Sequence, residues 1–451
     1  MESLLHRFAA PNLILVKRLS GRHKLSGAGD YLHCPASSPV ITGLLSNLAA
    51  TADSIMSLPL LALFFAAFAF GTAEFVIAGV LPDVAAGLGR SVPVAGNLVT
   101  GYAIGIAVGG PLLAVLTKKL RRKSLILVLG AIFTLGQALC ALALNFELLL
   151  GARVLVAVVH GAYFGIAPVV AVNLVAEDKR GFAVALILSG LTVSNILGVP
   201  AGTAIGNAFG WRATFWAVGA LGLLATLAIA AFLPSTAGQA ATAGSLLKEF
   251  KVLGRQQIVT SLAIVMLAMI GQYGVFTYIA PLLRDVTGLD AGLIPWLLLL
   301  FGAGSTIGVF IGGRLADWKL MPSLMAIMTL QVLVYVGLYF ASPYPWLMAG
   351  TVLLWGGVNF AFGSPVQSRV LAWTADAPNL ASALIPSGFN IGIAIAVTLA
   401  SNLLESGFGY RNLPWLGAIA MALAVAIAVL SYALEKRSGA RPPAANALSA
   451  T

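Results

Sequence analysis

Apolar residues gather in long runs that short polar segments separate, from Leu58 almost to the end of the chain. Each run holds about 18 to 25 residues, enough for an α-helix to cross roughly 30 Å of hydrocarbon. The pattern therefore predicts an all-α membrane protein with twelve transmembrane helices. We expect these spans at about 58–79, 93–116, 124–144, 147–174, 182–207, 212–233, 257–282, 292–313, 321–341, 345–368, 380–403 and 413–434.

Basic residues indicate on which side of the membrane the termini lie. The N-terminal segment, the loops after spans 2, 4, 6 and 8, and the C-terminal segment together carry twenty Lys and Arg residues. The opposite loops carry Arg90, Arg212, Arg284 and Arg411. Because cytoplasmic loops are enriched in Lys and Arg, we expect both termini in the cytoplasm, with the chain in the inner membrane.

The longest break between spans, 234–256, divides them into two sets of six. The sets repeat each other: Ala185–Gly190 returns as Ala383–Gly388 at an offset of 198, and Gly210–Trp216 as Gly409–Trp415 at 199. Duplication of this kind builds a substrate site between two bundles that rock against each other. The sequence thus predicts two pseudo-symmetric six-helix bundles at 57–233 and 257–434, a cytoplasmic linker at 234–256 and a cytoplasmic tail at 435–451.

Residues 1–56 differ from the rest of the chain. Basic residues punctuate this segment, and its longest apolar run, around Asn12–Val16, is too short for the core of a signal peptide. We expect a flexible, basic cytoplasmic tail. Met56 directly precedes the first span, and a second hypothesis is that translation begins there, which would leave almost no tail.

Small residues recur at every fourth position in span 5, at Gly198, Gly202 and Gly206. On a helix these glycines form one stripe against which a second helix backbone can pack. Pro200 removes one backbone hydrogen bond and bends the helix. We interpret this stripe as a hinge, together with Gly190 and its repeat Gly388; ordinary packing of small residues is the alternative.

Further segments accompany the stripe: Gly71–Asp83 in span 1, Arg153 with His160 in span 4, and Gly210–Trp216 after span 5. On these segments the chain, from about 57 to 434, resembles the twelve-span drug:proton antiporters of the major facilitator superfamily, close to arabinose, sugar, purine and chloramphenicol efflux permeases. The resemblance implies the two-bundle fold. The Gly-Pro motif of span 5 marks antiporters in that family, so the resemblance also implies export.

The loop between spans 2 and 3 departs from the family pattern. The family places an acidic residue before basic ones there, whereas Lys118 stands at the acidic position of a wholly basic loop. The acid occurs only in the second copy, where Arg314 and Asp317 follow span 8. We expect Arg314 and Asp317 to form a cytoplasmic gate; anchoring of the topology is the alternative role of the basic loop.

Glu74 is the only carboxylate well inside span 1. A carboxylate in hydrocarbon is costly unless it is protonated or paired. Such a group can hold a proton near neutral pH and release it when water or a cation approaches. We therefore expect Glu74 to couple transport to protons; a Glu that only hydrogen-bonds a neighbouring helix is the alternative.

Arg153 and His160 lie seven residues apart in span 4, so their side chains project from one face of the helix, two turns apart. Arginine keeps its charge, whereas histidine can change its own near neutral pH. We expect Arg153 to favour the ionised form of Glu74, and His160 to be a secondary proton or substrate group. Snorkelling of Arg153 to the membrane surface and a neutral, hydrogen-bonding His160 stay open.

Other polar and aromatic residues lie inside spans of both bundles. A mostly apolar, aromatic cavity with few hydrogen-bonding groups suits moderately amphipathic organic molecules. Each such residue can instead join two helices, so only the set indicates a cavity. The candidates are Thr192, Asn195, Gln272, Tyr273, Tyr278, Asn359, Ser387 and Asn390.

Composition limits the other functions. The chain is 59% hydrophobic and 9% charged, and it has two cysteines, Cys34 and Cys140, which offer neither a disulfide framework nor a metal cluster. It contains no phosphate-binding Gly-x-x-x-x-Gly-Lys-Ser/Thr loop for ATP. We expect no enzyme activity, no cofactor or metal and no nucleic-acid partner. We expect a monomer in the lipid bilayer, with transport driven by the proton gradient.

These features together predict a proton-coupled transporter that exports small organic molecules, such as drugs, sugars or nucleosides, by alternating access. An importer or facilitator of a small metabolite on the same fold is the nearer alternative. A membrane sensor that transports nothing is the more distant one.

Overall fold

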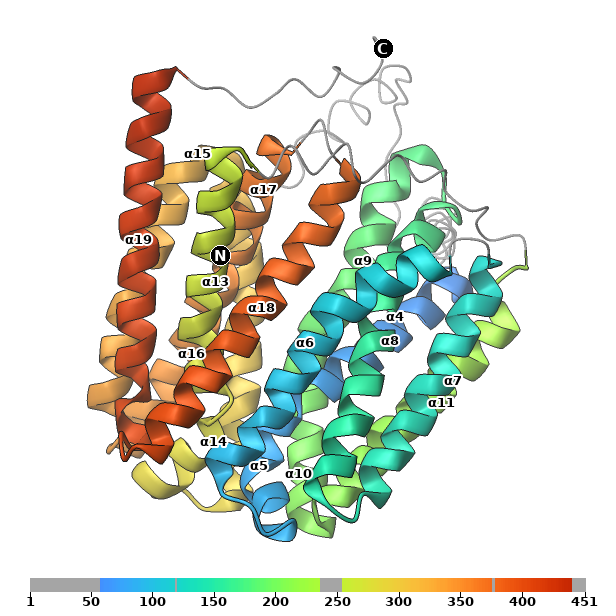
Figure 1. The fold of residues 1–451 in the computed structure, drawn as a ribbon, viewed down its shortest axis with the longest axis horizontal. Coiled ribbons are helices and arrows are strands. Elements are labelled where there is room, and N and C mark those ends of the chain that lie inside the picture. The colour runs from blue at the N-terminus through green and yellow to red at the C-terminus, as the bar shows by residue number, and fades with distance from the viewer. Residues whose placement is uncertain (1–56, 118–119, 236–253, 375–377, 440–451) are drawn as a thin grey trace, which may run out of the picture. The chain divides into compact units, whose positions relative to one another are not determined.

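The computed structural model describes residues 57–117, 120–235, 254–374 and 378–439, and within these ranges the regular structure is helical (Figure 1). The predicted tail at 1–56, Lys118, most of the 234–256 linker and the chain from 440 onward lie outside the described residues. The fold class predicted from the sequence, all-α with membrane-spanning helices, is confirmed.

The first half of the chain contains six apolar spans, and two of them are interrupted. The first span breaks at Val76, and the fifth contains a π-helical turn. In chain order the elements are α4 (Leu58–Phe75), α5 (Ile77–Gly87), α6 (Val92–Leu116), α7 (Arg122–Leu142), α8 (Phe146–Val172), η1 (Glu177–Lys179), α9 (Arg180–Val193), η2 (Ser194–Gly198), α10 (Val199–Phe209) and α11 (Trp211–Phe232).

The second half repeats this arrangement with longer helices. Its elements are α13 (Gln256–Phe276), α14 (Ile279–Pro281), η4 (Leu282–Val286), η5 (Ala291–Leu293), α15 (Ile294–Ala341), α16 (Pro345–Ala361), α17 (Gly363–Trp373), α18 (Pro378–Glu405), η6 (Tyr410–Asn412) and α19 (Leu413–Ser438). The helix α15 holds two spans, because Lys319 interrupts it with a non-helical backbone (φ −149°, ψ 90°). Eleven candidate spans occur in the described residues, and division at Lys319 gives the twelve expected.

Close packing of glycine against backbone shows the internal repeat in three dimensions. In the first half Gly105 of α6 lies against the backbone of Val154 in α8. In the second half Gly304 of α15 lies against the backbone of Leu353 in α16, and both residues are 199 positions further along the chain. Helices bring their backbones this close in a membrane by removing side chains from the contact, since lipid supplies no hydrophobic drive.

The two halves contact each other where α6 lies along α18, where η2 and α10 meet α15, and at the end of the molecule where α5 and α14 lie (Figure 1, lower part). The Tyr278 hydroxyl and the Ser401 hydroxyl both donate to the Pro93 carbonyl, at 3.2 and 2.9 Å. The Asn207 side-chain amide donates to the Ala291 carbonyl at 2.7 Å. A few polar bonds between otherwise apolar surfaces therefore close this end.

Charges outside the spans reinforce the same end. Arg284 of η4 donates from Nε to the Asp285 carboxylate at 2.9 Å. This hydrogen bond, helped by the nearby Asp83 carboxylate of α5, raises the pKa of the Arg284 guanidinium above its usual value. Because α5 belongs to the first half and η4 to the second, the attraction between Asp83 and Arg284 acts across the contact.

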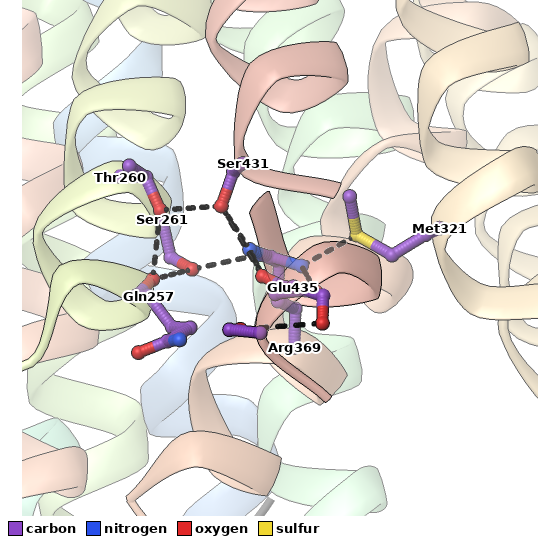
Figure 2. A network of polar contacts seen from close by, with 8 residues as sticks. Gln257, Thr260, Ser261, Met321, Arg369, Ser431 and Glu435 are labelled. Carbon is purple, nitrogen blue, oxygen red and sulfur yellow. Dashed lines mark hydrogen bonds and ion pairs between the residues drawn. The ribbon is translucent and has the colours of Figure 1, made fainter. Parts of the chain in front are cut away.

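A buried arginine ties together four spans of the second half (Figure 2). Arg369 of α17 is 1% exposed, and its Nη2 lies 2.5 Å from the Glu435 carboxylate of α19. Its Nε donates to the Ser261 hydroxyl of α13 at 2.9 Å, and Nη2 also donates to Ser431 at 2.8 Å. The sulfur of Met321 in α15 contacts Nη1. The guanidinium is thus satisfied on every side, as a buried charge requires.

We predict that Gly304→Ala destabilises the fold. A Cβ at this position would overlap the Leu353 carbonyl oxygen, a backbone atom that cannot move aside. Overpacking of this kind costs about 1 to 3 kcal/mol, which thermal unfolding in detergent would detect. Gly313→Ala is the matched control, since nothing lies within 4 Å of a Cβ there. Equal unfolding temperatures for the two variants would contradict the prediction.

We also predict that Glu435→Gln destabilises the second half by about 3 kcal/mol, because it leaves the Arg369 charge buried without its carboxylate. Glu147→Gln is the control. It removes the partner of Arg90 in an ion pair whose side chains are 46% and 65% exposed, so its effect should stay below about 1 kcal/mol. Denaturant unfolding in micelles measures the stability of both variants. An unchanged free energy of unfolding in Glu435→Gln would show that the ion pair adds no stability.

Candidate functional site

Glu74 lies in the last turn of α4, just before the break at Val76. Its side chain is 14% exposed, so the carboxyl group is largely enclosed by other helices. The location agrees with the position expected from the sequence, well inside the first span. What surrounds this carboxyl group decides whether it can exchange a proton.

His160 of α8 lies beside Glu74. Its Nε2 lies 3.7 Å from a Glu74 carboxylate oxygen, and the His160 side chain is 4% exposed. Its other ring nitrogen, Nδ1, lies 2.9 Å from the Tyr102 hydroxyl of α6. Glu74, His160 and Tyr102 therefore form a chain of polar groups that joins three helices.

Arg153 is buried in the same cluster at 1% exposure. Its Nε donates to the Leu98 carbonyl and its Nη1 to the Ala73 carbonyl, both at 3.3 Å. The guanidinium carbon lies 4.6 Å from the centre of the Tyr102 ring, a cation–π contact. The third nitrogen, Nη2, is buried with no hydrogen-bond partner in the described residues. Arg153 is thus a desolvated cation that is incompletely paired.

The positive charge of Arg153 acts on Glu74 through space. The two groups interact electrostatically, although no hydrogen bond joins them. Glu74 also interacts with the Tyr273 hydroxyl of α13, which belongs to the second half. The cluster therefore belongs to the first half, and its charge acts on Tyr273 in the second half.

The span-5 glycines pack against the helix that carries Glu74. A Cβ at Gly190 would lie 2.7 Å from that of Ala67 in α4, and those at Gly198 and Gly202 would meet Thr72 and Val76. Gly206 continues the row against Val80 of α5. The stripe thus brings α9 and α10 against α4 and α5 along most of their length.

The π-helical turn η2 ends at Gly198, two residues before Pro200. Proline lacks the N–H that would continue the regular ladder. The helix is therefore irregular just before Pro200, and π-helical turns of this kind often occur at functional sites. The predicted repeat, Gly388 of α18, faces Leu262 and Val265 of α13 in the corresponding way.

The structure does not bring all of the predicted cavity residues together. Gln272 and Tyr273 are buried in α13, whereas Ser387 of α18 donates to the Ala107 carbonyl of α6 at 3.4 Å and so lies where the halves meet. Thr192 is half-buried in α9. Asn195 and Asn390 each donate to a carbonyl of their own helix, at Leu191 and Pro386.

Two other candidates have contacts that bear on packing. Asn359 accepts a hydrogen bond from the buried side-chain amide of Gln331, which joins α16 to α15 within the second half. Tyr278 belongs to the polar closure at Pro93. The gate candidates Arg314 and Asp317 are exposed near the middle of α15, before the interruption at Lys319.

Sequence reasoning missed Tyr102, Arg369 and Glu435. Nothing in the sequence around Tyr102 indicates a functional role, because its partner His160 is on another helix. Arg369 follows directly after the expected end of span 10, where a basic residue indicates topology. Its pairing with Glu435 could not be read from the sequence. In the described residues no group of three or more His, Cys, Asp or Glu side chains could hold a metal ion.

The sequence pattern of the Major Facilitator Superfamily matches residues 63–377. The chain is 36% identical over 373 residues to the inner membrane transport protein YdhP of Escherichia coli (strain K12), a match that covers 83% of this chain and 95% of that protein. It is 34% identical over 375 residues to a chloramphenicol resistance protein of Streptomyces lividans, covering 83% and 96%.

Solved structures with the same fold include a D-xylose–proton symporter, with a TM-score of 0.67 at 16% identity over 82% of this chain and 96% of that one. A bacterial homologue of the lysosomal transporter Spinster, in an inward-facing and unoccupied conformation, gives 0.66 at 18% identity over 83% and 95%. At these identities the likeness concerns the fold. The family match and the relatives together show that the chain belongs to the Major Facilitator Superfamily and is a membrane transporter of small molecules, not an enzyme.

Proposed function

We propose that this transporter exports small organic molecules in exchange for protons, and that Glu74 is the group that carries the proton. The observation that supports this most is the enclosed Glu74 carboxyl group, which lies beside His160 and is acted on by the charge of the underpaired cation Arg153. An acid in such surroundings has two accessible states: a neutral, protonated state and an ionised state that the positive charge of Arg153 stabilises.

The two states follow from electrostatics. Ionised Glu74 balances Arg153, so the pair is neutral overall and the low dielectric makes their attraction strong. Protonated Glu74 leaves Arg153 with its two backbone carbonyls and the Tyr102 ring. Because neither state is fully satisfied, a substrate or a change in hydration can shift the balance between them.

Export then follows from mutual exclusion of proton and substrate. With the site open to the cytoplasm, substrate binds between the bundles as Glu74 releases its proton. With the site open to the outside, protonation of Glu74 helps to expel the substrate. Each ligand must weaken the binding of the other by the same factor, since coupling free energies are reciprocal.

The alternation uses bundles at 57–233 and 257–434 that rock about the glycine rows of α9, α10 and α18. The polar bonds at Pro93 and between Asn207 and Ala291 would hold the outer side closed in the described conformation. This assigns both termini to the cytoplasmic side of the inner membrane, as the basic loops indicate, and it requires one chain only.

The direction of transport rests on two observations. The span-5 glycine row and Pro200 form the motif that suggested antiport, and their π-helical defect is present. A relative that spans nearly the same length is named a chloramphenicol resistance protein, which favours export of drug-like molecules. A susceptibility screen of cells with and without the transporter would provide a substrate for the tests below.

We predict that Glu74→Gln abolishes coupling. In proteoliposomes with an imposed pH gradient, substrate accumulation should fall to the level of empty liposomes, because a glutamine cannot exchange a proton. Exchange of labelled for unlabelled substrate should persist, since it needs no net proton movement. Glu147→Gln, which changes an exposed carboxylate, should retain full coupling. Undiminished accumulation by Glu74→Gln would refute the assignment, and proton flux in the same direction as substrate would indicate an importer.

We also predict that linking Asn207 to Ala291 stops transport. The Asn207→Cys, Ala291→Cys double variant, with Cys34 and Cys140 replaced by serine, should react with a short reducible bifunctional thiol reagent, since the two residues are in contact. Transport should then fall at least tenfold and return on reduction. The two single-cysteine variants treated in the same way serve as controls. Full transport in the linked protein would show that this contact need not open.

A further inference from the structure

Tyr102 of α6 contacts both Arg153 and His160, the two residues that act on Glu74. Its ring contacts the Arg153 guanidinium at 4.6 Å, and its hydroxyl lies 2.9 Å from His160 Nδ1. We propose that Tyr102 is a positioning residue that holds His160 in the neutral tautomer with its proton on Nε2, aimed at the ionised carboxylate of Glu74. This inference rests on the proposed proton coupling and assigns His160 the role of a fixed donor.

The imidazole ring of His160 has one partner for each nitrogen. Nδ1 faces the Tyr102 hydroxyl, and Nε2 faces a Glu74 carboxylate oxygen at 3.7 Å. The His160 ring lies between two aromatic rings. Its centroid is 5.5 Å from that of Phe70, in an edge-on contact, and 5.0 Å from that of Phe164, whose ring is tilted relative to it. These aromatic contacts restrict rotation of the ring, so exchange of its two nitrogens would require the surrounding side chains to move.

The direction of the hydrogen bond follows from which atoms can donate. An ionised carboxylate only accepts, so Nε2 must carry a proton if it is to stabilise ionised Glu74. Neutral imidazole has one N–H, and Nδ1 must then accept. The Tyr102 hydroxyl can donate to it. A cation over the phenol ring withdraws electron density from the hydroxyl, which makes Tyr102 a better donor beside Arg153.

The charge balance of the cluster favours a neutral histidine. Arg153 supplies one positive charge and ionised Glu74 one negative charge. The other titratable groups that reach the cluster are Cys140 of α7 and Tyr273 of α13, which interact with Arg153 and Glu74 respectively. A protonated His160 would add an unbalanced charge at 3% exposure, where unpaired charge is costly.

The geometry also explains how Glu74 can lose its contact with His160 when it takes up a proton. At 3.7 Å the contact between Nε2 and the carboxylate is longer than a hydrogen bond. The N–H dipole therefore favours the ionised carboxylate without locking it. The bond between Tyr102 and His160 is buried and of ordinary length, so the donor stays aimed at Glu74 when Glu74 takes up a proton and when it releases one.

Nitrogen NMR of labelled histidine tests the tautomer directly. His6, His23 and His33 all lie within residues 1–56, so replacing them with glutamine leaves His160 as the only histidine of the full-length chain. In liposomes at alkaline pH we expect an unprotonated Nδ1 and a protonated Nε2. In Tyr102→Phe the signal of the opposite tautomer should appear. A protonated Nδ1 in the parent protein, or an unchanged spectrum in Tyr102→Phe, would overturn the proposal.

Ionisation of Glu74 gives a second readout that requires no substrate. Infrared difference spectra against Glu74→Gln isolate its carboxyl band, and the pH midpoint of that band can be followed. In Tyr102→Phe we expect the midpoint to rise by up to about one pH unit, because one unit is the net effect of a full hydrogen bond and the contact between Nε2 and the carboxylate is longer than that. Tyr163→Phe is the control, because its equally buried hydroxyl donates to the Leu63 carbonyl and not to His160. Equal midpoints in both variants would contradict the role of Tyr102.

Two substitutions of His160 keep the test decisive if Tyr102→Phe folds poorly. Glutamine places an amide nitrogen near the position of Nε2, and asparagine near that of Nδ1. His160→Gln should therefore keep the midpoint close to that of the parent protein, whereas His160→Asn should raise it. The reverse order would refute a donor at Nε2. If Glu74→Gln stays coupled while the tautomer is as expected, the proposed function fails and the assignment of Tyr102 as a positioning group does not.

Discussion

Burial of positive charge in a low-dielectric bundle is the constraint on which this structure depends, and the protein meets it in two ways. Arg369 is surrounded by Glu435, Ser261, Ser431 and Met321, so its charge is fully compensated and joins four spans. Arg153 has two long bonds to carbonyls, an aromatic ring and one nitrogen without a partner among the described residues. The complete set of partners stabilises a fold, whereas the incomplete set leaves a cation free to respond to Glu74.

The backbone packing that holds these charges uses glycine in place of hydrophobic side chains. Lipid tails are as apolar as leucine, so helices in a membrane gain little from burying apolar area and associate by close approach. Rows of glycine supply it where α9 and α10 meet α4 and α5, and where α15 meets α16. The side chains of Thr72, Val76 and Val80 pack into the first of these rows, so the helix that carries Glu74 is held along one side by close contact.

The contact between the two halves combines glycine packing, at Gly302 of α15 against the backbone of Asn195 and Ile196, with polar bonds at one end. Hydrogen bonds at Pro93 and between Asn207 and Ala291 join it at one end, and the attraction between Asp83 and Arg284 adds to them there. When this end opens, water can replace each of these hydrogen bonds, because hydroxyl, amide and carbonyl groups are well hydrated. A contact of this kind can be broken and remade at modest cost. This distinguishes it from the buried Arg369 pair, which has no solvated alternative.

Much of this protein could be predicted from its sequence, since apolar runs long enough to cross a bilayer define spans, and an acid or arginine inside a span is rare enough to indicate a site. That reasoning predicts a site at Glu74 and Arg153, with His160 on the same helix face as Arg153, and the repeat at 198 to 199 residues indicates two halves. The partnerships of Tyr102 with His160, Gln331 with Asn359 and Arg369 with Glu435 were decided only by the tertiary structure. The reason is physical: a helix that is apolar on all sides has no polar stripe to reveal its rotation, so the packing of the bundle determines which side chains meet.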